Sequence, residues 1–88
     1  MRKYKIVLKP SAKREFSALP SQIQLRIVEA LEILSLNPLS ELLQIKKLKG
    51  VDSLYRIRIA DYRVVYEVQK TILLIIVIKI GHRREVYS

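Results

Sequence analysis

The sequence predicts a single compact α+β domain in which two helices cover one face of an antiparallel sheet. A chain of 88 residues, half of them hydrophobic, has room for one domain with one modest core. Apolar residues recur at helical spacing in the first half of the chain and at strand spacing in the second half. We therefore expect residues 1–88 to form one domain, with both helices packed on the same side of the sheet.

The first element is expected to be a strand over residues 2–9. It ends at Pro10, because proline cannot donate a hydrogen bond to a strand ladder. Ser11 is the candidate N-cap of a short helix, and Pro20 ends that helix because the residue before a proline avoids the helical region. The apolar side of this helix consists of Ala12, Phe16 and Leu19.

A second helix is predicted to begin at Pro20 and to end at Asn37. Its apolar face consists of Ile23, Ile27, Ala30, Leu31 and Leu34. The helix carries only Arg26 as a base, beside Glu29 and Glu32, so it does not have the charge of a basic membrane-surface helix.

The second half of the chain is expected to form the rest of the sheet. Residues 45–49 are interpreted as a short basic strand that stops at Gly50. Residues 55–59 alternate apolar residues with arginines, which is typical of a half-buried strand.

Two further strands follow after tight turns. Residues 60–61 form the turn into a strand over residues 62–69, and residues 70–71 form the next turn. Residues 72–80 are apolar on both faces, which is typical of a central strand, and this strand is expected to end at Gly81. The order is strand, helix, helix and three strands, with room for one extra short strand, and its short connections predict antiparallel pairing.

Charge is the strongest compositional signal. Seventeen Lys and Arg against eight Asp and Glu give a net charge of +9. Such a surface attracts polyanions, so nucleic acid or an acidic protein is the expected partner. No membrane partner is expected.

Composition also excludes several classes of site. The chain has no cysteine and one histidine, which excludes disulfides, thiolate metal sites and a two-histidine acid–base pair. The carboxylates of the second half have no spacing that suggests Mg²⁺ ligands, so neither a metal nor a cofactor is expected. The N-terminus does not have the pattern of a signal peptide and the longest apolar run is too short to span a membrane, so we expect a cytoplasmic protein.

Strand alternation gathers arginines into one candidate site. Arg56 and Arg58 project to the same face of their strand, and Arg63 follows the turn on the neighbouring strand. Arg83 and Tyr87 come after the last strand. Guanidinium groups bind phosphate through two parallel hydrogen bonds and keep their charge, so a phosphate site is one interpretation. An ordinary solvated sheet face is the other.

The stretches LKGVDSLYRIRIADYRVVYEV and IGHRREVY, with the opening YKIVLKPSAKREFSALP, resemble the RelE branch of the RelE/ParE toxin superfamily. The resemblance implies the toxin of a type II toxin–antitoxin system, a ribosome-dependent mRNA endonuclease that inhibits translation and arrests growth. Such an enzyme cuts the codon in the ribosomal A site without metal. The 2′-hydroxyl attacks its own phosphate and leaves a 2′,3′-cyclic phosphate and a 5′-hydroxyl. The implied partners are the ribosome, mRNA and a small RelB-like antitoxin, acidic where it binds the toxin, in a hetero-oligomer.

The resemblance also implies a role for each matching residue. Arg56 and Arg58 match a pair that is usually lysine. Arg63 matches an arginine assigned to phosphate binding, and Arg83 one assigned to transition-state charge. Tyr87 matches a terminal tyrosine that contacts the base and supports proton transfer.

Arginine at both lysine positions leaves open which residue is the general base and which the general acid. Arginine stays protonated, whereas the pKa of a desolvated lysine can be tuned. Tyr87 and His82 are therefore the candidate proton carriers. The basic and imidazole side chains expected to bind RNA are Lys46, Lys47, Lys49, His82 and Arg84.

Two alternative functions remain open. A ParE-like toxin shares the fold and poisons DNA gyrase, but that branch lacks the set formed by Arg63, Arg83 and Tyr87. A non-catalytic RNA-binding module needs exposed aromatic residues on its strands, whereas aromatics are only 7% of this chain.

Overall fold

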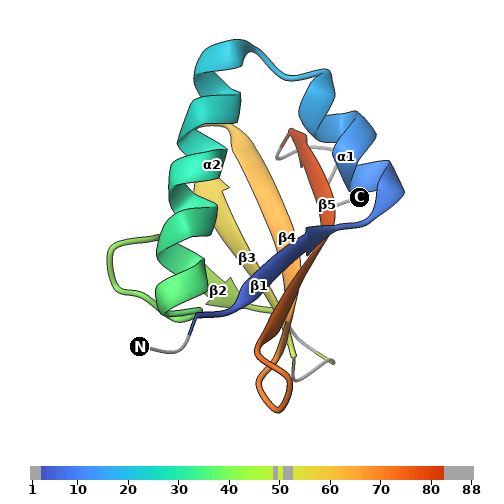
Figure 1. Ribbon diagram of the computed structural model, residues 1–88. Coiled ribbons are helices and arrows are strands. Elements are labelled where there is room, and N and C mark those ends of the chain that lie inside the picture. The colour runs from blue at the N-terminus through green and yellow to red at the C-terminus, as the bar shows by residue number, and fades with distance from the viewer. Residues whose placement is uncertain (1–2, 49, 51–52, 83–88) are drawn as a thin grey trace.

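A five-stranded mixed sheet and two helices make up the computed structural model, which describes residues 3–48, 50 and 53–82 (Figure 1). The two helices lie on one side of the sheet, as predicted. The elements in chain order are β1 (Lys5–Leu8), α1 (Pro10–Ser17), α2 (Ser21–Leu36), β2 (Ile45–Lys47), β3 (Leu54–Ile59), β4 (Tyr62–Gln69) and β5 (Leu74–His82).

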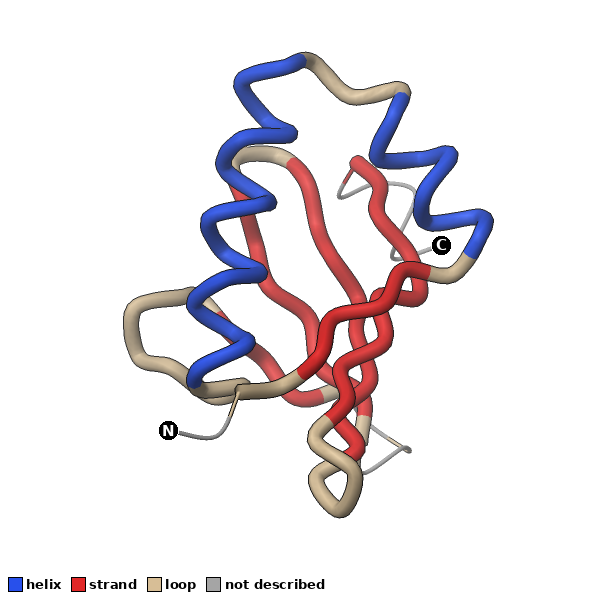
Figure 2. Tube along the Cα trace, in the orientation of Figure 1, coloured by secondary structure: helices blue, strands red, loops and turns tan. Residues whose placement is uncertain are grey.

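The strand order is β1-β5-β4-β3-β2. Strands β2 to β5 form an antiparallel meander, whereas β1 pairs with β5 in parallel, from Lys5 opposite Leu74 to Leu8 opposite Val77. The expectation of a wholly antiparallel sheet is therefore wrong for β1. The physical reason is the long helical crossover, which carries the chain from β1 to β2 at the opposite edge of the sheet (Figure 2). No tight turn joins β1 to its neighbour, so nothing local imposes an antiparallel pair.

Several element ends differ from the sequence predictions, among them the start of β5, which lies at Leu74 and not at residue 72. Helix α1 begins at Pro10, and its N-cap is Lys9 with φ −62° and ψ 154°, so Ser11 is not the cap. Proline suits the first helical position because its φ is already helical and no partner is needed for an N–H there. Strand β5 continues through Gly81 to His82, because Gly81 pairs with Arg63 across the sheet. Strand β1 is shorter than residues 2–9.

The core fills the space between the helices and the sheet. Four of the five residues predicted to form the apolar face of the second helix are buried, and Ile23 packs against them. The largest fully buried side chains are Tyr66, Ile27, Leu34, Ile57, Ile75, Ile80, Val64 and Val77. Because β3 buries Ile57 and Ile59 against the helices, its intervening residues project to the opposite face.

Tyr66 anchors the loop after α2 to the centre of the sheet. Its hydroxyl donates a hydrogen bond of 3.0 Å to the carbonyl oxygen of Pro38, and its ring stacks on Tyr55 at 5.8 Å between centroids. Burial, and secondarily the neighbouring Tyr55 hydroxyl, raises the pKa of Tyr66 well above its ordinary value. Tyr66 therefore remains a hydrogen-bond donor throughout the physiological pH range.

Replacing Tyr66 with phenylalanine is expected to lower the free energy of unfolding by about 1–2 kcal/mol, because the Pro38 carbonyl loses its donor. The raised pKa also predicts a pH dependence. Stability from the neutral phenol is complete below pH 10, the ordinary pKa of tyrosine, and is lost as the pH rises further. Urea unfolding at neutral and alkaline pH measures both effects. Tyr62→Phe is the matched control, and equal losses in the two variants would contradict the role of the Pro38 bond.

Candidate functional site

Three arginines share the sheet face that is opposite the helices. Arg56 and Arg58 lie on this face because Ile57 and Ile59 occupy the other one. The register of β3 and β4 places Arg63 directly across from Arg58. We call the group formed by Arg56, Arg58 and Arg63 the arginine cluster.

Lysines on the flanking strands extend the positive charge. Lys46 of β2 is directly opposite Arg56 of β3. On the other side of β3, Arg56 pairs with Val65 of β4, and Val65 pairs in turn with Lys79 of β5, so Lys79 lies on the same face. Directly opposed like charges, such as the pair formed by Arg58 and Arg63, destabilise a sheet. The paired positive charges make this sheet face a candidate site for an anionic ligand.

The three arginines differ in exposure. The Arg63 side chain is buried, with 8% of the residue accessible, Arg56 is half-buried and Arg58 is exposed. The Nε–H group of Arg58 donates to the carbonyl oxygen of Ala60 at 3.3 Å, in the turn between β3 and β4. A guanidinium group keeps its charge when buried and is then screened less by salt. Arg63 is therefore suited to fixed electrostatic contacts, and Arg58 to contacts with a bound molecule.

Other predicted site residues lie elsewhere. His82 pairs with Tyr62 on the helix side of the sheet, where their rings make an edge contact at 5.8 Å and 79°. The structure does not bring His82 onto the face of the arginine cluster. Lys47 pairs with Tyr55, so it alternates with Lys46 and does not share its face. Four predicted residues lie outside the described part of the chain: Lys49, Arg83, Arg84 and Tyr87.

Sequence reasoning missed the contact that holds α1 against β5. Strand β1 ends opposite Val77, so the next part of β5 has no strand neighbour on that side and α1 takes its place. Glu15 of α1 accepts a hydrogen bond from the Ile80 N–H group at 2.9 Å, and its other oxygen lies 3.7 Å from Lys79 Nζ. The only available signal was that Glu15 is the one acidic residue of α1.

The Glu15 contact predicts different stabilities for two substitutions. Glu15→Ala leaves the Ile80 N–H group without its acceptor and is expected to cost about 1–3 kcal/mol of unfolding free energy. Glu15→Gln keeps a carbonyl acceptor and loses only the partly exposed ion pair, so we expect a loss below about 1 kcal/mol. Urea unfolding of both variants tests this, with Glu29→Ala on exposed α2 surface as the control. Equal losses for Ala and Gln would show that the hydrogen bond is unimportant.

The described residues contain no cluster of three or more His, Cys, Asp or Glu side chains that could hold a metal ion. Within the same residues, no helix has the length and apolar character needed to cross a membrane.

The sequence profile of the family described as the ParE toxin of the type II toxin–antitoxin system parDE matches residues 6–87. A protein from Methanocaldococcus jannaschii that carries the toxin name RelE1 is 34% identical over 87 residues, which cover 98% of this chain and 97% of the relative. The chain belongs to the RelE/ParE superfamily of type II toxins.

Solved structures of RelE/ParE toxins share this fold. The archaeal RelE–RelB complex from Pyrococcus horikoshii aligns with a TM-score of 0.83 and 30% identity, over 92% of this chain and 96% of the matched chain. The intact E. coli RelBE complex aligns with a TM-score of 0.79 and 26% identity, over 90% of this chain and 95% of the matched chain. The predicted resemblance to this superfamily is confirmed.

Proposed function

We propose that this toxin is a ribosome-dependent, metal-independent endoribonuclease that cuts mRNA in the ribosomal A site and thereby inhibits translation. The observation that carries the proposal is the arginine cluster, in which Arg58 and Arg63 face each other across two strands beside Arg56. Each guanidinium group is positively charged and can donate two parallel hydrogen bonds to a phosphate. These properties fit a phosphodiester that gains negative charge during cleavage.

The reaction requires a base for the 2′-hydroxyl, an acid for the leaving 5′-oxygen and positive charge for the phosphorane. In the proposal Arg63 binds the scissile phosphate, and Arg56 and Arg58 hold the flanking phosphates. Arg83 stabilises the charge of the transition state. Tyr87 stacks on a base and assists proton transfer. His82 is less suited to proton transfer, because it lies on the helix side of the sheet and not on the face of the arginine cluster.

The proposed protein partner is a RelB-like antitoxin, acidic where it binds. Two relatives with this fold have been solved as RelE–RelB complexes. A net charge of +9 and a basic sheet face favour association with an acidic chain. Ribosomes and mRNA are the proposed targets, so the toxin acts in the cytoplasm.

Mapping RNA 5′ ends after induction tests this proposal. We expect growth arrest and new 5′ ends only within translated frames, both suppressed when the neighbouring antitoxin gene is co-expressed. Equal cutting of naked RNA would exclude a ribosome-dependent enzyme. The second candidate is a gyrase poison, favoured by the match to the ParE profile. Intact messages together with gyrase-dependent DNA breaks would establish it instead.

A further inference from the structure

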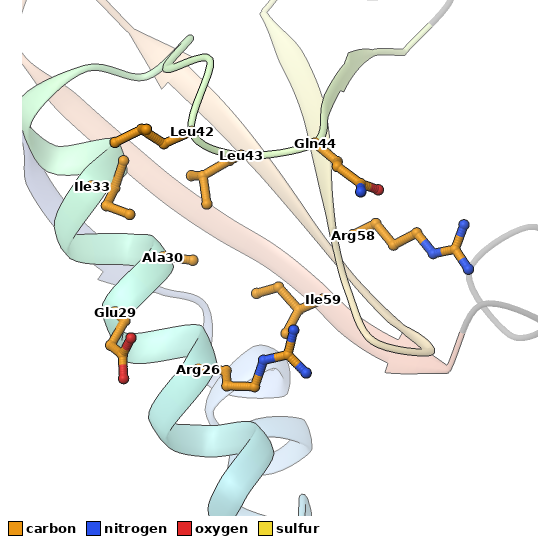
Figure 3. A pocket seen from close by; sticks show the side chains of 9 residues that line it. All are labelled: Arg26, Glu29, Ala30, Ile33, Leu42, Leu43, Gln44, Arg58 and Ile59. Atoms are coloured by element: carbon orange, nitrogen blue, oxygen red, sulfur yellow. The ribbon is translucent and has the colours of Figure 1, made fainter.

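A pocket of about 270 Å³ opens between α2, β3 and the loop that precedes β2 (Figure 3). Its lining is aliphatic where α2 faces the sheet: Ala30, Ile33, Leu43 and Ile59. The volume suits one or two aliphatic side chains and is smaller than an ordinary small-molecule site. We call it the α2–β3 pocket.

Positive charge flanks this aliphatic lining. Arg26 lines the pocket from α2, and Arg58 lines its rim from β3 with its guanidinium directed away from α2, while the Glu29 side chain is directed away from the Arg26 guanidinium (Figure 3). Within the described residues, neither arginine forms an ion pair with a carboxylate. Leu42, at the wall of the pocket, is 80% exposed. An apolar pocket with two cationic sides and an exposed leucine fits a protein segment that is both acidic and aliphatic.

The lining chemistry favours a peptide over a nucleotide. None of the described residues that line the pocket is aromatic, so they offer a base no stacking surface. Glu29 also belongs to the lining, and its charge would repel a continuous phosphate backbone. A peptide can place single carboxylates beside Arg26 and Arg58 and keep the region near Glu29 free.

We propose that the α2–β3 pocket binds an acidic segment of the antitoxin, which inserts an aliphatic side chain and places carboxylates beside Arg26 and Arg58. This inference rests on the proposed antitoxin partner. Arg58 belongs both to the pocket and to the arginine cluster. A segment held in the pocket therefore withdraws Arg58 from RNA, so binding and inhibition occur in one event.

The test uses the antitoxin encoded beside this gene, purified and titrated into the toxin by calorimetry. Arg26→Glu is expected to weaken binding by at least about 10-fold, because an attractive contact becomes repulsive. Leu42→Ser is expected to weaken it by about 10-fold, because apolar contact at the pocket wall is lost. Both residues are exposed and lie outside the arginine cluster, so both variants should still arrest growth when expressed without antitoxin.

Matched controls separate the pocket from general charge and hydrophobicity. Lys13→Glu on α1 and Ile72→Ser in the turn between β4 and β5 change exposed residues far from the pocket, and both are expected to bind as the wild type does. Wild-type affinity in both pocket variants would overturn this inference and leave the proposed function intact. Failure of the wild-type toxin to bind the antitoxin would overturn the proposed partner and the inference together.

Discussion

Replacing Arg63 with alanine is expected to lower the single-turnover rate of mRNA cleavage on a programmed ribosome by roughly 10²–10³-fold. Arg63 is the most buried member of the arginine cluster and faces Arg58 across the hairpin. In the proposed reaction, its charge is therefore fixed in place before RNA binds, so little reorganisation is needed as the phosphorane forms. Binding of the toxin to the ribosome should change much less than the chemical step.

Two further variants sharpen this test. Arg63→Lys is expected to recover only part of the rate, because one ammonium group replaces two parallel hydrogen bonds. Arg14→Ala removes an exposed arginine from α1, away from the cluster, and should cleave at the wild-type rate. Circular dichroism should show that the Arg63 variants are folded. Equal cleavage rates for folded Arg63→Ala and wild type would remove Arg63 from the site.

Tyr87 is expected to show two separable contributions to cleavage. Tyr87→Ala removes both the ring and the hydroxyl, and stacking on a base is worth about 1–3 kcal/mol, or roughly 5- to 150-fold in rate. Tyr87→Phe keeps the stacking surface and should lose less. Because arginine is a poor proton carrier in general, the hydroxyl of Tyr87 is the proposed one, and the Phe variant should also change the pH profile of single-turnover cleavage.

Deletion of residues 87–88 is the control for Tyr87. Cleavage at the wild-type rate after this deletion would contradict a role for the tyrosine and would assign proton transfer to another group. An unchanged pH profile in Tyr87→Phe, with a slower rate in Tyr87→Ala, would restrict Tyr87 to stacking.

Local chemistry made much of the fold and of the arginine cluster predictable. Pro20 and Asn37 delimit α2, and the alternation in residues 55–59 fixes which residues face the core. The two-residue turn at Ala60 and Asp61 then determines the register, and so the pairing of Arg58 with Arg63. When a short turn joins two alternating strands, the shared face follows from the sequence.

Contacts between distant segments were not predictable in the same way. The parallel pairing of β1 with β5 depends on how the helical crossover returns the chain, which no local pattern specifies. The hydrogen bond from Ile80 to Glu15 exists because β1 ends early and leaves one edge of β5 to α1. The position of His82 on the helix side follows from a register irregularity between Val65 and Tyr66 that the sequence does not reveal.

The pairing of β1 with β5 sets when the toxin can complete its fold during synthesis. The first strand must wait for its partner, because every other strand and both helices lie between them in the sequence. At about 5–20 residues per second, that delay lasts on the order of several seconds for each new chain. Contacts of such high sequence separation also slow the final folding step. The nascent chain therefore remains an incomplete sheet until translation has passed β5, and any binding or activity that needs the complete sheet can begin only after that point.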